Sequence, residues 1–448
     1  MSIKKILIAN RGDIAVRIIR TCKEIGVKTV AIYSEIDKDS LHRFIADESI
    51  CIGPNNISKS YNNIDNIVYL AKKLKCDAIH PGFGFLSENP KFVERCDENG
   101  IIFIGPTMEQ MSLMGDKSRA RETMMKLGIP VVPGSKSVLK SKEDAMEVAD
   151  GIGYPVMIKA SNGGGGKGMR IVYSAEDLPS LYDMASSEAL ASFGSSDLYM
   201  EKFIENPRHI EVQVFGDKFG NALHFGDRDC SMQRRNQKVI EESLSPYITD
   251  EQRESLYKTA LDVIKGIGYI GAGTIEFIFD KDKNYYFIEM NTRIQVEHPI
   301  SEMITGLDLI KLQIEIASGR PIPFAQEDIQ FRGHAIECRI NAENPDNGFA
   351  PCPGKIESLN LPGGFGVRFD TFVYAGYTIP PLYDSMIGKL ICWADTREEC
   401  INRMYRALDE MILEGIYTNI EFHKALISSD AFINDTHHTK FIENEFNN

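Results

Sequence analysis

The chain has 448 residues, of which 43% are hydrophobic and 25% are charged, the balance of an ordinary globular protein rather than of a disordered or membrane-spanning one. This length predicts two to four packed domains. A formal net charge of -14 argues against nucleic-acid or membrane partners, because those surfaces require a basic face. The nine cysteines are scattered without a C-x-x-C pair, as in a reduced protein, so we expect a cytoplasmic location.

The N-terminal segment, up to about residue 105, alternates strand and helix patterns. Its apolar strands are KKILIAN, KTVAIYS, CDAIHPG and GIIFIG, and an amphipathic stretch over residues 13–25 follows the first of them. Apolar strands separated by helices predict a parallel α/β sheet.

The middle of the chain, over residues 131–199, has the pattern of a smaller α+β unit. It contains a predicted helix over residues 142–150 and two predicted strands, PVMIKA and MRIVY. From residue 200 the chain becomes strand-rich, with a helix expected over residues 250–266. From about residue 333 we expect further short strands, including HAIECRI, and a closing helix over residues 397–414.

Four consecutive glycines, residues 163–166, lie between the two strands of the smaller unit. This is a hairpin tip and not the strand-to-helix turn of a Walker A loop. Glycine lets backbone N–H groups approach polyphosphate oxygens, and Lys159 on the preceding strand can add a charge. The alternative is a flexible surface loop. A second glycine pattern, over residues 266–271, follows a helix and precedes a strand, which is the reverse of the dinucleotide-binding context.

The most informative segment runs over residues 274–297 and has the pattern of two strands joined by a short polar turn. Pairing around residues 282–283 sets Glu276 opposite Glu289. Two carboxylates directly across a ladder repel each other. A divalent cation between them removes the repulsion, and Asn291 supplies a neutral oxygen on the same face. The sequence therefore predicts a metal site on this hairpin.

Polar alternation continues along the second strand. One face is expected to carry Glu289, Asn291, Arg293, Gln295 and Glu297, while the residues between them face the core. The alternative is a solvated edge strand, which commonly alternates in this way. We favour a functional face, because Asn and Gln are poor choices for a strand face selected only for solubility.

Motifs along nearly the whole chain resemble those of biotin carboxylases in the ATP-grasp superfamily, and they occur in that family's order. They are NRGDIAVRIIR, HPGFGFLSEN, LMGDKSRAR, KASNGGGGKGMRIV, EKFIENPRHIEVQV, DRDCSMQRRNQK, FIEMNTRIQVEHP, GHAIECRINAE and YDSMIGKLI. The motifs FIEMNTRIQVEHP and RGHAIECRINAE are the most specific of these.

The resemblance implies a mixed α/β and α+β fold with several domains. In chain order these are a Rossmann-like N-terminal domain (1–113), a linker helix (114–130), a mobile glycine-tipped ATP-grasp lid (131–202), the ATP-grasp body (203–332) and a C-terminal biotin carboxylase domain (333–448).

The resemblance also implies a set of nucleotide and metal ligands. The expected ATP-binding residues are Lys117, Lys159, Gly164, Gly165, Gly166, Glu201, Lys202, Phe203, Ile204, His209, Gln233, Asn236, Glu276 and Glu289. The expected metal ligands are Glu276, Glu289 and Asn291. The residues from Glu201 to Ile204 are expected to meet adenine, partly through backbone groups.

The bicarbonate-binding residues that the resemblance implies are Lys238, Arg293, Gln295, Val296 and Glu297. Bicarbonate is a poor electrophile, so it must be activated by phosphoryl transfer, which depends on positioning and charge neutralisation. We expect Lys238 and Arg293 to hold the anion and Glu297 to act as its general base, giving carboxyphosphate and ADP. Arg339 is expected to bind biotin and to stabilise its enolate-like oxygen.

The implied cofactors and partners follow from the same resemblance. They are ATP, two ions of Mg²⁺ or Mn²⁺, and biotin carried as a substrate on a separate biotin carboxyl carrier protein, because the chain has no A-M-K-M sequence. Carboxyltransferase subunits and a homodimer are also expected. We favour acetyl-CoA carboxylase of fatty acid biosynthesis as the context, and the carboxylase of pyruvate or another acid stays open.

Two positions depart from the family pattern. Phe83 stands where the family commonly has tyrosine, and Asn236 stands where it has histidine. Both departures predict altered substrate or nucleotide affinity rather than inactivity. Two other functions stay open, namely a different ATP-grasp ligase and a non-catalytic nucleotide-binding subunit.

Overall fold

The computed structural model describes residues 3–135, 137–160, 169–193 and 195–446. The chain divides into two compact units. The first consists of Met1–Leu127, Arg208–Phe277 and Glu289–Asn448, and the second of Gly128–Pro207 and Ile278–Ile288.

A parallel sheet of five strands in the order β3-β2-β1-β4-β5 opens the first unit. Its strands are β1 (Lys5–Ile8), β2 (Lys28–Tyr33), β3 (Glu48–Cys51), β4 (Ala78–His80) and β5 (Ile102–Phe103). The accompanying helices are α1 (Gly12–Glu24), α2 (Leu41–Ile45), α3 (Ile64–Lys73), α4 (Pro90–Glu98), α5 (Met108–Gly115) and α6 (Lys117–Lys126). Helix α1 buries Ile14, Ile18 and Cys22 at helical spacing. The predicted parallel α/β sheet is therefore confirmed.

A sheet of eight strands forms the rest of the framework, in the order β13-β12-β9-β10-β11-β14-β21-β19. These strands are β9 (Arg208–Gly216), β10 (Ala222–Arg234), β11 (Gln237–Ser243), β12 (Gly271–Phe279), β13 (Tyr285–Asn291), β14 (His334–Asn341), β19 (Val367–Thr371) and β21 (Met386–Ala394). Polar residues of β9, β11, β12 and β14 supply most of the candidate site described below.

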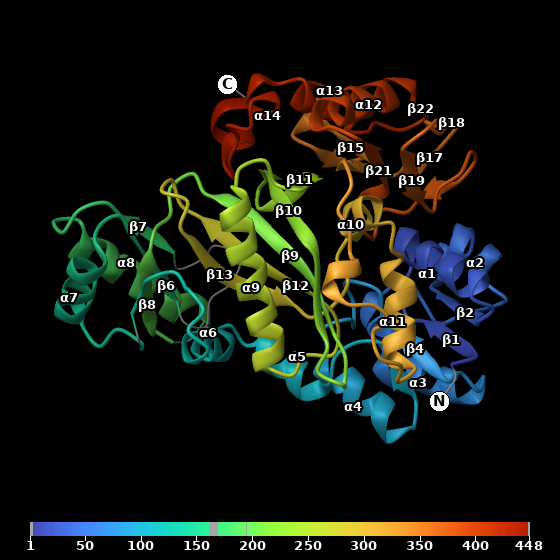
Figure 1. Cartoon of the computed structure of the whole chain (residues 1–448), viewed down its shortest axis with the longest axis horizontal. Helices are drawn as coiled ribbons and strands as arrows, with labels where there is room; N and C mark the ends of the chain where they lie inside the picture. The colour runs from blue at the N-terminus through green and yellow to red at the C-terminus, as the bar shows by residue number, and fades with distance from the viewer. Residues whose placement is uncertain (1–2, 136, 161–168, 194, 447–448) are drawn as a thin grey trace. The chain divides into compact units, whose positions relative to one another are not determined.

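Further helices belong to this part of the chain. They are α9 (Asp250–Gly266), α10 (His298–Thr305), α11 (Leu309–Ala317), α12 (Arg397–Glu410), α13 (Ile420–Ile427) and α14 (Asp430–Ile433). Helix α9 packs across β9 and β10 (Figure 1). Its bounds are those predicted from the sequence, because a capping box between Thr249 and Gln252 fixes its start.

The second unit contains a three-stranded antiparallel sheet in the order β7-β6-β8. Its elements are α7 (Lys142–Ile152), β6 (Val156–Ala160), β7 (Arg170–Val172), α8 (Leu178–Phe193) and β8 (Leu198–Lys202). A core of its own includes Val156, Ile158, Leu178 and Met200, all of them fully buried. The predicted glycine tip, residues 163–166, lies outside the described residues.

The predicted closing helix over residues 397–414 is wrong at its end and is not the last helix. Helix α12 stops at Glu410, because Met411 adopts an extended conformation. The β-branched Ile412 then opens a short strand, β22 (Ile412–Glu414), which pairs with β18 (Ser358–Asn360). The remaining short strands are β15 (Glu343–Asn344), β16 (Ala350–Pro351), β17 (Gly354–Lys355) and β20 (Thr378–Ile379).

The predicted strand face running from Glu289 to Glu297 is also wrong as a regular element. Strand β13 ends at Asn291, and Glu297 is the N-cap residue of α10. One contact and one residue choice favour the end of the strand. The Thr292 N–H donates to Glu88 at 3.1 Å, and a proline occupies the first turn of α10. The polar side chains of this segment converge through a bend rather than through strand alternation.

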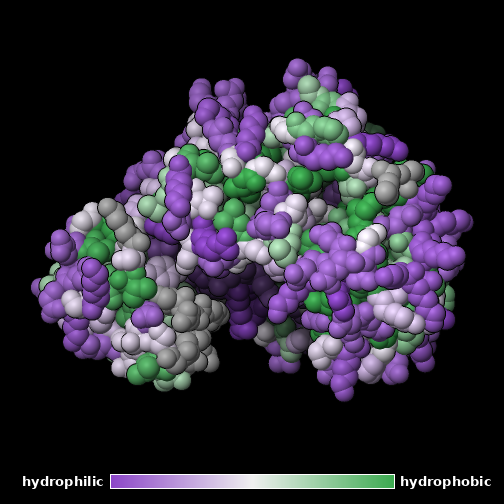
Figure 2. All heavy atoms as spheres, turned by 90° about the horizontal axis from the view of Figure 1, so that it is seen from below, coloured by the Kyte–Doolittle hydropathy of each residue, from purple (hydrophilic) through white to green (hydrophobic). Residues whose placement is uncertain are grey.

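Hydrophilic residues predominate on the face drawn in Figure 2, with apolar residues in scattered groups between them. None of the helices in the described ranges is long and apolar enough to span a membrane.

Replacement of Gly216 by alanine is expected to destabilise the protein by about 3 kcal/mol. A Cβ on Gly216, the last residue of β9, would lie 2.0 Å from the carbonyl oxygen of Tyr269. Urea unfolding of G216A measures the effect. The matched control is G115A, because no described atom lies within 4 Å of a Cβ built there. Equal stability of the two variants would contradict the close approach.

Candidate active site

A partly buried lysine surrounded by three carboxylates lies at the centre of the candidate site. The Lys238 Nζ, on β11, is 2.6 Å from Oε2 of Glu211, 3.0 Å from Oε1 of Glu276 and 2.7 Å from Oε1 of Glu297. Glu211 and Glu276 come from β9 and β12, which are neighbours in the sheet, and Glu297 begins α10. We call these four residues the Lys238 cluster.

The groups of the cluster respond differently to burial, which raises the pKa of Glu211 in spite of Lys238 and Arg228. Burial disfavours an ammonium ion, but the carboxylates of Glu211, Glu276 and Glu297 outweigh it and hold the pKa of Lys238 well above its usual range. Burial likewise disfavours ionised Glu297, yet Lys238 and Arg339 hold the pKa of Glu297 well below its usual range. The buried carboxylate of Glu297 is therefore ionised and shared between two cations.

Two side-chain amides orient Glu276. Asn291 Nδ2 and Gln295 Nε2 donate to Oε1 of Glu276 at 2.9 Å and 2.8 Å. Arg293 in turn donates from Nη2 to Oδ1 of Asn291 at 3.0 Å. The segment following β13 thus brings its predicted polar residues to the Lys238 cluster, although not as one strand face.

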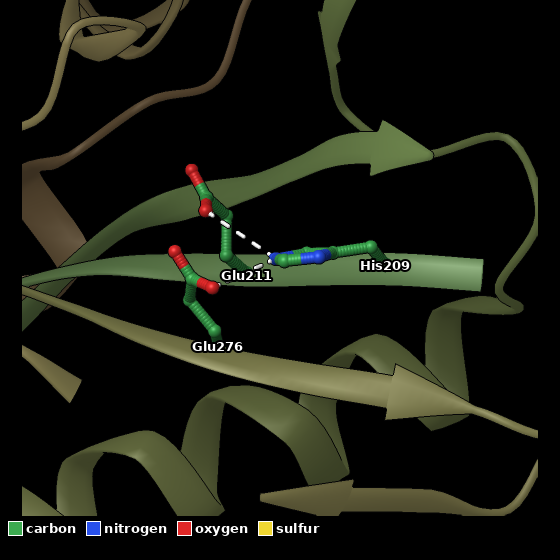
Figure 3. Close-up of side chains that lie close together, drawn as sticks. All are labelled: His209, Glu211 and Glu276. Carbon is green, nitrogen blue, oxygen red and sulfur yellow. Dashed lines mark ion pairs between the residues drawn. The ribbon is translucent and has the colours of Figure 1, made fainter. Parts of the chain in front are cut away.

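His209 approaches the same carboxylates (Figure 3). Its Nε2 lies 3.1 Å from Oε2 of Glu276 and 3.9 Å from Oε2 of Glu211. Figure 3 shows His209 and Glu211 on one strand, with Glu276 pointing toward them from another. Gln233, also predicted from the sequence, lies 3.1 Å from Nδ1 of His209.

Two further arginines, Arg293 and Arg339, bond carboxylates in or near the candidate site. Arg293 Nε donates to Oε2 of Glu88 at 2.8 Å. Arg339 Nε donates to Oε1 of Glu241 at 2.6 Å, and its Nη2 donates to Oε2 of Glu297 at 3.0 Å. Glu297 thus accepts from Lys238 on one oxygen and from Arg339 on the other.

A cavity of about 30 Å³ opens beside Lys238 and Arg339, lined also by Gln237, Asn341 and Phe349. A volume of this size has room for about two water molecules.

Sequence analysis did not identify Arg228, which contacts Glu211 of the Lys238 cluster. Arg228 is fully buried and donates to Oε1 of Glu211 at 2.6 Å, to Oε1 of Gln213 at 2.8 Å and to Oε1 of Gln295 at 2.8 Å. The signal that could have revealed it is its place between two aspartates, Asp227 and Asp229, inside a strand. Charged residues are almost never fully buried unless they are paired.

Val296 contributes its backbone rather than its side chain to this neighbourhood. Its carbonyl oxygen accepts from the buried Lys389 Nζ at 2.7 Å, and that Nζ also lies 3.3 Å from Oδ2 of Asp13. Lys389 thereby holds the backbone of the residue that precedes Glu297.

The predicted metal ligands are oxygen donors of the kind that Mg²⁺ and Mn²⁺ prefer. Burial opposes ionisation of Glu276, but Lys238 and His209 hold its pKa well below the usual range. The Glu289 side chain is 39% exposed, with Lys117 Nζ at 3.5 Å. The donor set fits a divalent cation. Among the described residues, however, the ligand atoms that group with Glu276 belong to His209 and Glu211, so the site made with Glu289 stays a prediction.

The predicted ATP ligands of the second unit lie on β8 and β6. Lys159 and Glu201 form an ion pair across these two strands. Lys202 Nζ donates to the carbonyl oxygens of Gly153 and Tyr154 at 3.0 Å and 2.8 Å. Phe203 and Ile204 follow directly and are half-buried. Gly164, Gly165 and Gly166 lie outside the described residues.

The two departures from the family pattern differ in their surroundings. Asn236 lies at the exposed tip between β10 and β11 with a φ of 62°, a conformation that asparagine tolerates better than most residues. Its Oδ1 accepts from Lys440 Nζ at 3.4 Å. Phe83 is half-buried, and Lys389 Nζ lies 5.8 Å from the centre of its ring.

Three family models match successive parts of the chain. They describe the N-terminal domain of biotin carboxylase (residues 2–111), the ATP-binding domain of the carbamoyl-phosphate synthase L chain (116–325) and the C-terminal domain of biotin carboxylase (337–444). The chain is also 54% identical to biotin carboxylase 1 of Bacillus subtilis over 98% of both chains. The chain belongs to the biotin carboxylase family. It is an ATP-dependent ligase of this class.

Solved biotin carboxylase structures have the same fold. The complex of the Campylobacter jejuni enzyme with a β-γ-ATP ligand aligns with a TM-score of 0.92 at 51% identity and covers 99% of both chains. The biotin carboxylase domain dimer of Hydrogenobacter thermophilus 2-oxoglutarate carboxylase, with MgADP, ADP and bicarbonate, aligns with a TM-score of 0.91 at 50% identity, covering 99% of this chain and 98% of that one. The ATP-grasp fold expected from the sequence is therefore confirmed.

Replacement of Arg228 by methionine is expected to destabilise this biotin carboxylase by about 3–5 kcal/mol, because it leaves Glu211 buried with one cation fewer. Urea unfolding gives the change in free energy.

The control for that variant is R95M, which removes an exposed arginine that also pairs with two carboxylates. Little change is expected there, since exposed pairs are screened by water. A wild-type unfolding midpoint for R228M would contradict the assignment of Arg228 as the support of the cluster.

Proposed function

We propose that the chain carboxylates biotin on a separate carrier protein, using ATP and bicarbonate and passing through carboxyphosphate. The observation that carries the proposal is the position of Glu297. Its carboxylate is 2% exposed and bridges Lys238 and Arg339. A buried base flanked by two partly buried cations suits a substrate that is an anion and must lose a proton.

Bicarbonate is proposed to bind to Lys238 and Arg293, with Gln295 and the backbone of Val296 completing its surroundings. When bicarbonate accepts hydrogen bonds from Lys238, that lysine stabilises the ionised carboxylate of Glu297 less. The pKa of Glu297 then rises toward the working pH, where a general base is most effective. Glu297 removes the proton of bicarbonate while an oxygen of bicarbonate attacks the terminal phosphorus of ATP, and the bond to ADP breaks.

Each unit by itself contains residues that are proposed to bind ATP. In the first unit these are Lys117, His209, Gln233, Asn236, Glu276 and Glu289, and in the second Lys159, Gly164, Gly165, Gly166, Glu201, Lys202, Phe203 and Ile204. Glu276, Glu289 and Asn291 would hold Mg²⁺ or Mn²⁺, which would neutralise the phosphate charge. The complexes of related proteins with a β-γ-ATP ligand and with MgADP support this assignment.

The second step transfers the carboxyl group. Carboxyphosphate breaks down to CO₂ and phosphate, and the phosphate takes the N–H proton of the biotin ureido ring. The ureido nitrogen then bonds to the carbon of CO₂. Arg339, whose guanidinium is permanently charged, would stabilise the negative charge on the ureido oxygen.

The partners we propose are a biotin carboxyl carrier protein and carboxyltransferase subunits, with acetyl-CoA as the final acceptor and a homodimer as the working form. The 2-oxoglutarate carboxylase domain resembles this chain as closely as a protein named simply biotin carboxylase does. The acetyl-CoA assignment is therefore to be tested through the transferase rather than through this chain.

Replacement of Glu297 by glutamine is expected to lower bicarbonate-dependent ATP hydrolysis at least a hundredfold, because the amide cannot accept the proton. Phosphate release with and without bicarbonate measures it. E398Q, an exposed glutamate of α12, is the control and should retain the wild-type rate. Wild-type stimulation by bicarbonate in E297Q would remove Glu297 from the role of base.

Affinity capture with the tagged chain, in the cells that produce it, is expected to recover a biotinylated carrier together with an acetyl-CoA-specific carboxyltransferase. Streptavidin blotting detects the carrier, and mass spectrometry identifies the transferase. Recovery of a transferase that acts on pyruvate or on 2-oxoglutarate would contradict the acetyl-CoA assignment while leaving the biotin reaction intact.

A further inference from the structure

The C-terminal helix α13 holds the main chain of Arg339. The carbonyl oxygen of Arg339 accepts two side-chain hydrogen bonds, from Asn419 Nδ2 at 2.9 Å and from His423 Nε2 at 2.7 Å. Asn419 is 4% exposed and His423 is fully buried. Both donor side chains are therefore buried, and a hydrogen bond in such surroundings is electrostatically stronger than one at the surface.

The side chain of Asn419 bonds to strand β14 rather than to its own helix, α13. It is the N-cap residue of α13, a position at which asparagine usually accepts a hydrogen bond from the first helical turn. Its side chain makes no such capping bond. Instead, its Oδ1 accepts from the N–H of Asn341 at 2.8 Å, while its Nδ2 reaches Arg339. The side chain thus bridges two residues at the end of β14.

His423 is held in one tautomer. The Arg339 carbonyl can only accept, so the hydrogen must reside on Nε2. Burial lowers the pKa of His423 to about 4, which keeps the ring neutral at pH 7. Its Nδ1 is buried and has no hydrogen-bond partner within the described ranges. An imidazole with one nitrogen left unpaired is a costly choice for packing alone, so the bond to Arg339 accounts for its presence.

The hydrogen bonds from Asn419 and His423 reach Arg339 just beyond the end of the pairing between β11 and β14. Strand β11 pairs with β14 from Ser243 opposite Ala335 to Ile240 opposite Cys338. Arg339 is the next residue, and on the other side it pairs with Lys389 of β21. Helix α13 therefore takes over beyond the end of the β11 pairing, at the residue whose guanidinium bonds Glu241 and Glu297.

We infer that Asn419 and His423 are positioning residues for the carboxylation of biotin, which set the guanidinium of Arg339 by fixing its backbone. The inference rests on the proposed role of Arg339 toward biotin. Lys238 contacts Glu276 and Glu297 without any part played by α13, and α13 reaches Glu297 only through one hydrogen bond from Arg339. The step that activates bicarbonate is therefore affected less than the step that uses biotin.

Two variants test this in the full-length protein: His423→Leu, which keeps the volume of the side chain, and Asn419→Ala. The assay measures carboxylation of free biotin and bicarbonate-dependent ATP hydrolysis in the same preparation. The ratio of carboxylation to hydrolysis is expected to fall about tenfold or more in each variant, since small displacements of a catalytic group cost one to two orders of magnitude in rate. The KM values for ATP and bicarbonate should change by less than about twofold, because neither variant replaces a residue that is proposed to bind these substrates.

The matched control is His42→Leu. His42 is also fully buried, has a pKa lowered to about 4 by burial, and its Nε2 contacts a carbonyl oxygen, that of Ile32, at 3.1 Å. It should lose stability as His423→Leu does, without any change in the ratio.

An unchanged ratio in whichever α13 variant folds would overturn the inference, as would an equal fall of both activities in all three variants. Absence of biotin carboxylation in the wild-type protein would instead overturn the proposed function itself.

Discussion

The structure depends on keeping one ammonium group and three carboxylates together inside a sheet. Lys238 Nζ lies within 3.0 Å of Glu211, Glu276 and Glu297. Removing these charges from water costs several kcal/mol per ion, and only close pairing recovers it. The arrangement is therefore a poor source of stability and a strong constraint on geometry. Any change that separates β9, β11 and β12 leaves a buried charge without its partner.

The same constraint explains the layers around the cluster. Arg228 supplies a second cation to Glu211, and Asn291 and Gln295 supply neutral donors to Glu276. Lys389 fixes the backbone of Val296 next to Glu297. Each group satisfies a polar atom that water cannot reach, and together they hold the catalytic side chains before any substrate binds. Such preorganisation is the main means by which enzymes stabilise charge in a transition state.

Much of the framework could be predicted from local patterns. The parallel N-terminal strands and helix α9 follow from apolar runs and from capping residues, which act over a few neighbours. The polar residues of the FIEMNTRIQVEHP segment could be recognised as functional. Their placement on one face of a single strand was wrong, because the strand ends at Asn291. The bend after Asn291 depends on Glu88, more than 200 positions away in the sequence.

Glu211 and Arg228 could not be assigned for a related reason. Each stands in a strand with several other polar residues. Only the packed sheet reveals that Arg228 pairs with Glu211 and that Glu211 pairs with Lys238. The short strand after α12 likewise depends on a distant partner, β18. The glycine tip at residues 163–166 lies outside the described residues, so its role in phosphate binding remains a prediction.

The most direct measurement is the bicarbonate dependence of ATP hydrolysis in a Lys238→Arg variant at saturating Mg-ATP. Arginine keeps the charge that Glu211, Glu276 and Glu297 require, but it cannot place a compact ammonium between them. The account predicts a folded protein whose KM for bicarbonate rises about a hundredfold or whose stimulation by bicarbonate disappears. A wild-type bicarbonate saturation curve in this variant would contradict it.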